Sequence, residues 1–170
     1  MLYYAFETLF WTGIRRNELL ALTPKDFDFN KAEMHIKRQY KNNVKRSRDT
    51  KPKTESGDRF IKMPKKLSDE LQYYISQLYG VKENDRLFTM SGAGLSRTFA
   101  RCIEQAGVKK IRLHDLRHSH VALLINNGFT PYEISKRMGH DSQRITLQYA
   151  HLYPSAQDEM AKKLDSMMGD

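Results

Sequence analysis

The sequence contains a single cysteine, Cys102, among its 170 residues. One cysteine cannot form an internal disulfide, and it cannot build a cysteine-rich zinc site. The chain also lacks the run of roughly 18 or more apolar residues that a membrane-spanning helix needs. Its N-terminus has no basic segment followed by an apolar stretch, which a secretion signal would require. These absences predict a cytoplasmic protein that is neither exported nor inserted into a membrane.

Acidic residues are the minority among the charged ones. The chain has 20 Asp and Glu against 29 Lys and Arg, so its formal net charge is +9. A basic balance of this size suits a polyanionic partner such as nucleic acid. Because many basic proteins bind no nucleic acid, the charge favours this class of partner without establishing it.

The length is sufficient for one domain with a hydrophobic core and short for two. Residues 1–170 are therefore expected to form a single domain. The residues directly after Met1 are already apolar and aromatic, as in the interior of a longer protein. We expect an isolated or truncated domain of a larger architecture.

Hydrophobic periodicity predicts a mainly helical α+β fold. Alternation of Met34 and Ile36 with polar neighbours, and the run 59–63, predict a small antiparallel sheet between the helices. Apolar residues at helical spacing, with their caps and breakers, predict helices at about 2–12, 15–22, 67–78, 92–107, 115–127, 131–138, 142–150 and 154–168.

A strongly basic segment joins the two extended runs. In it, one acid, Asp49, faces eight cations: Lys37, Arg38, Lys41, Lys45, Arg46, Arg48, Lys51 and Lys53. Such a segment is typical of a solvated hairpin. Its alternative interpretation is a DNA-binding hairpin, which the motifs elsewhere in the chain favour.

Several short motifs follow one another in a specific order. Residues 13–18 read Gly-Ile-Arg-Arg-Asn-Glu, a Lys53-Thr54 pair precedes Arg59, and residues 114–118 read His-Asp-Leu-Arg-His. A Gly-His pair stands at 139–140, and Tyr149 follows nine residues after the histidine. Singly these motifs are weak, but the ordered set resembles the tyrosine recombinase (phage integrase) family over essentially the whole chain.

Cleavage of a phosphodiester needs the residue types found in these motifs. The phosphate repels nucleophiles and gains charge during attack, so fixed cationic donors must face it. Arg15 and Arg117 supply planar forks that stay protonated near neutral pH. A tyrosine can form a covalent phosphotyrosine that stores the bond energy for rejoining. The site therefore needs no external energy source.

The resemblance implies a role for each matching residue. Tyr149 is expected to be the nucleophile, Glu18 to orient its neighbours, and Lys53 to protonate the leaving 5′-hydroxyl. His114 is expected to accept the tyrosine proton, and His140 to bind the phosphate. The implied catalytic set is Arg15, Lys53, His114, Arg117, His140 and Tyr149, without metal or cofactor.

The resemblance also implies a fold and partners. It implies a catalytic domain with a small three-stranded antiparallel sheet, acting on double-stranded DNA through a 3′-phosphotyrosine. Self-association into a tetramer on DNA is expected, with the C-terminal helix at 154–168 as the contact between subunits. The DNA-binding domains that usually precede the catalytic one in this family are absent from this chain.

Some assignments have near alternatives. Arg16, Lys51 and Tyr153 lie close to the assigned site residues and could take their roles. Their positions relative to the neighbouring motifs favour Arg15, Lys53 and Tyr149 instead. His114 and His118 stand four residues apart, as zinc ligands do on a helix, but no HExxH motif or cysteine ligand accompanies them.

Two alternative functions also fit parts of the sequence. Residues 130–150 resemble a helix-turn-helix, which would suit a non-catalytic regulator. A type IB topoisomerase would use a similar tyrosine and cationic set on a single duplex.

Overall fold

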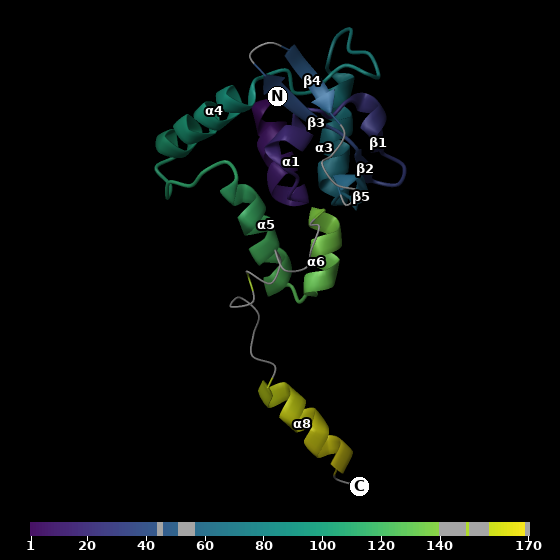
Figure 1. Ribbon diagram of the computed structural model, residues 1–170, viewed down its shortest axis with the longest axis vertical. Helices are drawn as coiled ribbons and strands as arrows, with labels where there is room; N and C mark the ends of the chain where they lie inside the picture. The colour runs from purple at the N-terminus through teal and green to yellow at the C-terminus, as the bar shows by residue number, and fades with distance from the viewer. Residues whose placement is uncertain (44–45, 51–56, 140–148, 150–156, 169–170) are drawn as a thin grey trace.

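The computed structural model describes residues 1–43, 46–50, 57–139, 149 and 157–168, and it is mainly helical (Figure 1). This architecture confirms the predicted fold class. In chain order the elements are α1 (Leu2–Thr12), α2 (Arg16–Leu19), the 3-10 helix η1 (Pro24–Asp26), β1 (Phe27–Asp28), β2 (Glu33–Ile36), β3 (Gln39–Asn43), β4 (Arg46–Thr50), β5 (Arg59–Lys62), α3 (Lys65–Ser76), α4 (Gly92–Gln105), α5 (Asp115–Asn126), α6 (Pro131–Met138) and α8 (Gln157–Met168).

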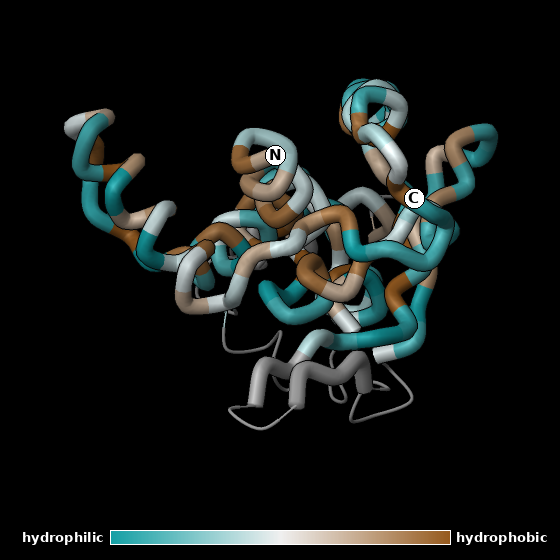
Figure 2. The backbone as a smooth tube through the Cα atoms, turned by 90° about the horizontal axis from the view of Figure 1, so that it is seen from above, coloured by the Kyte–Doolittle hydropathy of each residue, from teal (hydrophilic) through white to brown (hydrophobic). Residues whose placement is uncertain are grey.

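Helix α1 lies at the centre of the fold, between α3 and α5 (Figure 1). Its Ala5 and Leu9 are buried in the main core. The ring of Phe6 meets that of Phe99 on α4 edge to face, at 5.1 Å between centroids. Hydrophobic residues accordingly gather around the N-terminal helix in the middle of Figure 2. The chain leaves α1 at Gly13, whose left-handed φ of 66° favours glycine.

The main sheet has three antiparallel strands in the order β1-β2-β5. Met34 lies opposite Ile61 in the register, and Ile36 lies opposite Arg59. Met34, Ile36 and Ile61 are buried, as strand alternation requires. The predicted three-stranded sheet is confirmed, and Arg59 shares its inward face.

The basic segment forms a separate two-stranded sheet. Strands β3 and β4 pair antiparallel, with Gln39 opposite Thr50 and Asn43 opposite Arg46. The predicted hairpin is therefore present in the backbone. At its base, the buried Asp26 carboxylate pairs with Lys37 Nζ at 2.9 Å and with Arg38 Nη2 at 2.6 Å.

Helices α5 and α6 pack on each other through a second, smaller core. It consists of Val121, Ile125, Ile134 and Met138, and Tyr149 packs against it. Thr130 caps α6 by accepting a hydrogen bond from the Glu133 backbone, and Pro131 occupies the first helical position, so that α6 begins where the sequence predicted a helix. The packing brings the end of α6 close to the Gly13 turn.

Three of the predicted helices differ from the others in length, in description or in placement. The helix predicted over 15–22 is shorter, because Thr23 turns the chain by donating its backbone N–H and its hydroxyl to Asp26. The helix predicted over 142–150 lies outside the described residues except for Tyr149. At the C-terminus, α8 stands apart from the body, and the side chains of 161–168 are exposed (Figure 1). Among the described residues, no helix is long and apolar enough to cross a bilayer.

Candidate active site

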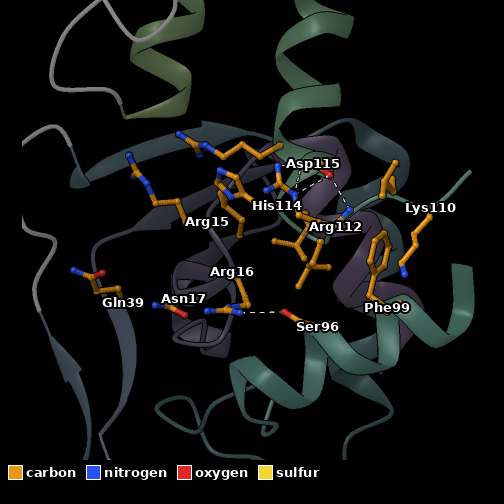
Figure 3. Close-up of a pocket in the computed structure, with 16 residues that line it drawn as sticks. Arg15, Arg16, Asn17, Gln39, Ser96, Phe99, Lys110, Arg112, His114 and Asp115 are labelled. Atoms are coloured by element: carbon orange, nitrogen blue, oxygen red, sulfur yellow. Dashed lines mark hydrogen bonds and ion pairs between the residues drawn. The ribbon is translucent and has the colours of Figure 1, made fainter.

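An open cleft of about 820 Å³ lies between the α1–α2 junction, α4 and the start of α5 (Figure 3). Several of the side chains that line it are cations. Arg15 and Arg16 come from the α1–α2 side, and Lys110, Arg112 and Arg117 come from the segment around the start of α5. His114 adds an imidazole to the lining. The cleft is therefore suited to an anionic ligand.

The two predicted arginines are held by backbone carbonyls at the end of α6. Arg117 is buried and donates from Nη2 to the Met138 carbonyl at 2.8 Å and from Nη1 to the Gly13 carbonyl. Arg15 donates from Nη2 to the Gly139 carbonyl at 3.1 Å. Carbonyls at a helix C-terminus carry partial negative charge, which favours guanidinium groups there. Each guanidinium has five N–H donors, so both retain donors for a ligand.

Glu18 connects the cleft to the sheet. Its carboxylate accepts hydrogen bonds from the Arg15 backbone and Nη1, each at 2.8 Å, and from Arg59 Nη2 at 3.0 Å. Arg59 is buried and also donates from Nε to the Arg137 carbonyl at 2.9 Å. Glu18 thus holds Arg15 at the cleft while Arg59 fixes Glu18 from behind.

The charges in this cluster perturb one another. Burial raises the pKa of the Glu18 carboxyl, but the charge and hydrogen bonds of Arg59, with those of Arg15, outweigh it and lower the pKa overall. Burial lowers the pKa of the Arg117 guanidinium, and repulsion from Arg15 lowers it further. An anion bound between the two arginines would relieve this repulsion.

Tyr149 lies next to α5. Its hydroxyl is in hydrogen-bond contact with Nδ1 of His118, and their ring centroids are 5.9 Å apart. Burial raises the pKa of the Tyr149 hydroxyl, and the charge of Arg117 partly offsets the increase. The predicted nucleophile therefore lies within the electrostatic influence of a predicted phosphate-binding arginine.

His114 lies at the start of α5, one helical turn before His118. The two rings meet edge to face at 4.8 Å between centroids. The pKa of His114 is lowered, first by desolvation and then by the charges of His118 and Arg117. This shift favours a neutral His114 beside the cationic cleft.

The structure thus brings Arg15, Glu18, His114 and Arg117 together, with Tyr149 nearby. Other predicted site residues cannot be placed: Lys53 and His140, and the hairpin residues Lys45 and Lys51, lie outside the described residues. Lys41, Arg46 and Arg48 are described only as backbone positions of β3 and β4. Lys37 and Arg38, predicted to bind DNA, form ion pairs with Asp26, and their DNA contacts stay a prediction.

Sequence reasoning missed two residues near the site. Arg59 was used only as a landmark after Lys53, yet strand alternation with Ile61 and Met63 was a signal that it faces inward. His118 was considered as part of the motif at 114–118 and as a possible zinc ligand. Its contact with Tyr149 joins positions 31 residues apart, which no local pattern could reveal.

In the described part of the chain, no three His, Cys, Asp or Glu side chains lie close enough together to bind a metal ion. The structure therefore gives the zinc hypothesis no support among these residues. His118 is instead engaged with Tyr149.

Comparison with known proteins gives consistent matches. The model of the phage integrase family matches residues 1–156. The sequence is 34% identical to the ICEBs1 integrase of Bacillus subtilis (strain 168), over 99% of this chain and 50% of that protein. The fold is similar to the Tn1549 transposon integrase in complex with transposon right end DNA, with TM-score 0.78 and 26% identity over 95% of this chain and 58% of that one. It is also similar to the XerA recombinase, with TM-score 0.71 and 25% identity over 95% of this chain and 55% of that one. The chain spans about half the length of the curated relatives it matches.

Proposed function

Because the chain belongs to the phage integrase family of tyrosine recombinases, we propose that it cuts and rejoins double-stranded DNA at specific sites through a 3′-phosphotyrosine. We propose that it is the integrase of a phage or another mobile element, in line with its similarity to the ICEBs1 and Tn1549 integrases. The observation that carries the proposal is the convergence of Arg15 and Arg117 on the end of α6, with the Tyr149 hydroxyl close to Arg117.

In the proposed reaction, the Tyr149 hydroxyl attacks the scissile phosphorus and displaces the 5′-oxygen of the next nucleotide. Arg15 and Arg117 each hold non-bridging oxygens and neutralise the charge that develops on them. His140 and His114 add hydrogen bonds at the phosphate, and Lys53 protonates the leaving oxygen. Glu18 positions Arg15, and the scheme uses no metal or cofactor.

The cleft and the hairpin form the proposed DNA surface. Phosphate contacts would supply most of the affinity, so binding should weaken steeply as salt rises. The Tn1549 integrase, a relative of solved structure, is in complex with transposon right end DNA. The proposed hairpin contacts are Lys37, Arg38, Lys41, Lys45, Arg46, Arg48 and Lys51.

The proposal extends to the architecture of the working enzyme. Residues 1–170 act as the catalytic domain, which works together with DNA-binding domains. The enzyme assembles as a tetramer on two duplexes in the cytoplasm. Helix α8 exposes Leu164 and Met167, which makes it the candidate contact with a neighbouring subunit.

Covalent trapping tests the proposed chemistry. The chain is incubated with a pool of nicked duplexes of randomised central sequence, so that the short strand released by cleavage diffuses away and rejoining fails. A denaturing gel should show a protein–DNA adduct that is absent from Tyr149→Phe. DNA binding without any adduct, with the chain alone and with an N-terminal DNA-binding domain restored, would support the non-catalytic regulator instead. Supercoil relaxation without a second site would support the topoisomerase.

A further inference from the structure

The contact between His118 and Tyr149 has no role in the proposed cleavage reaction. His118 Nδ1 lies within hydrogen-bond reach of the Tyr149 hydroxyl, with the ring planes tilted by 45°. Among the residues that the structure describes, it is the one ionisable side chain hydrogen-bonded to that oxygen. His118 is half-buried on α5, directly after the phosphate-binding Arg117.

The surroundings of Tyr149 create a need for a base. Tyr149 packs against the small core of α5 and α6, and burial raises the pKa of its hydroxyl. A phenol with a raised pKa is almost entirely protonated near neutral pH and is then a poor nucleophile. A general base must be within hydrogen-bond reach of the proton that it removes, and imidazole is the side chain best suited near neutral pH.

We propose that His118 is the general base that accepts the Tyr149 proton during cleavage and returns it during rejoining. This inference rests on the proposed function, and it assigns the nucleophile's proton to a residue other than His114.

The step balances in both directions. In cleavage, the bond from Tyr149 Oη to phosphorus forms, the bond from phosphorus to the 5′-oxygen breaks, and the Oη proton moves to His118 Nδ1. A separate donor, proposed above as Lys53, protonates the 5′-oxygen. In rejoining, the 5′-oxygen attacks the phosphotyrosine and gives its proton back to Lys53. The bond from the 5′-oxygen to phosphorus forms, the bond from phosphorus to Tyr149 Oη breaks, and the departing Tyr149 oxygen recovers its proton from His118.

The position of His114 supports this division of roles. His114 lines the cleft beside Arg117, whereas His118 contacts the hydroxyl. A positive charge on His118 opposes protonation of His114. Among the residues that the structure describes, the ionisable groups that face or influence His118 include His114 and Asp115 on α5, and Tyr149. The lowered pKa favours neutral His114, which suits it to be a hydrogen-bond partner for the phosphate.

Two substitutions of His118 separate a base from a positioning residue. His118→Ala removes both the contact and the base. His118→Asn places an amide near the position of Nδ1, which can accept the tyrosine hydrogen bond but cannot take its proton. We expect both variants to form the trapped adduct at least about 100-fold more slowly than the wild type. Ser119→Ala, at an exposed neighbouring position on α5, is the matched control and should cleave within twofold of wild type.

The pH dependence and the leaving group provide further readouts. Wild-type cleavage should slow on the acidic side as the base becomes protonated, and this limb should vanish in both His118 variants. A 5′-bridging sulfur leaves without needing a proton. It should therefore rescue Lys53→Ala and leave the His118 variants slow. Thermal unfolding of each variant checks that the fold is intact.

The outcomes distinguish the two proposals. No adduct from the wild type would overturn the proposed function itself. An adduct from the wild type together with unchanged rates in His118→Ala would overturn only the assignment of the base. Full activity in His118→Asn would show that His118 merely positions the hydroxyl. Faster cleavage by His118→Ala would mean that the contact restrains the nucleophile.

Discussion

Glu18 and Arg59 form a buried ion pair next to the candidate active site. Both side chains are less than one-tenth exposed, and their closest atoms are 3.0 Å apart. A buried pair adds little stability relative to well-packed apolar residues, but removal of one partner leaves an uncompensated buried charge. Because Glu18 also binds Arg15, the position of Arg15 at the cleft depends on the ion pair between Glu18 and Arg59.

Replacement of Glu18 by Gln should destabilise the fold by about 3 kcal/mol at neutral pH, because Arg59 loses its counter-charge. The folded-state pKa of Glu18 is lowered, so the stabilisation is present above the ordinary carboxyl pKa and is lost as pH falls through the folded-state value. The difference between wild type and Glu18→Gln in urea unfolding should accordingly shrink in acid.

Asp69→Asn is the control for this experiment. Asp69 pairs with Lys65 on the surface of α3, where both side chains are more than half exposed. Such pairs contribute roughly 0 to 1 kcal/mol, so a small effect is expected at every pH. If Glu18→Gln and Asp69→Asn lowered the free energy of unfolding equally, the buried pair would not have the structural role assigned to it.

Single residues were the hardest part of the structure to predict. The order of motifs identified Arg15, Glu18 and Arg117, and the fold brings them together. The partners that hold them, namely the carbonyls of Gly13, Met138 and Gly139, belong to the backbone and leave no signature in side-chain patterns. Tertiary packing decides such contacts, so spacing along the sequence could not reveal them.

At the scale of elements, the turn between α1 and α2 determines how the helices meet at the cleft. Gly13 has φ 66°, and its carbonyl accepts a hydrogen bond from Arg117. A Cβ at this position would lie 2.6 Å from the His120 ring and 2.9 Å from the end of Met138. The turn can therefore pack this closely against α5 and α6 only with glycine.

Gly13→Ala should lower the free energy of unfolding by about 3 kcal/mol, since left-handed strain and overpacking both add to the cost. Gly80→Ala is the matched control. Gly80 has φ 69°, but nothing lies within 4 Å of an added Cβ, so only the strain of about 1 to 2 kcal/mol applies. Urea unfolding measures the loss of unfolding free energy in both variants. Equal losses would mean that His120 and Met138 move aside for the added methyl group at no energetic cost.

Elements were more predictable than residues. Thr130 and Pro131 are helix-start signals that act locally, and the structure begins α6 at them. The alternation of Met34 and Ile36 similarly identified β2. The predicted helix over 15–22 was too long, because the bond network of Thr23 and Asp26 is specific to this fold.

At the scale of the whole molecule, α8 is set apart from the compact body (Figure 1). All its described side chains are exposed, including Leu164, Met167 and Met168. Exposed apolar residues on one element are common at interaction sites. The compact body of residues 1–139 and Tyr149 should therefore be stable without α8.

Truncation of the chain after residue 156 should change the free energy of unfolding by less than about 0.5 kcal/mol, because exposed residues contribute little to the fold. If α8 joins subunits as proposed, the truncated chain should still form the trapped adduct but lose complexes that contain two duplexes. Urea unfolding and native gels measure the two effects. A loss of stability above about 1 kcal/mol would instead place α8 against its own domain.

The anchoring of the arginines also bears on the order of folding. Arg117 reaches across 104 residues to Gly13, and Arg15 reaches across 124 residues to Gly139. Contacts between such distant positions close large loops, and they form only when most of the chain has found its place. In a nascent or partly unfolded chain, Arg15 and Arg117 therefore do not yet converge on the end of α6. If the chain cuts DNA as proposed, cleavage should require the fully assembled fold.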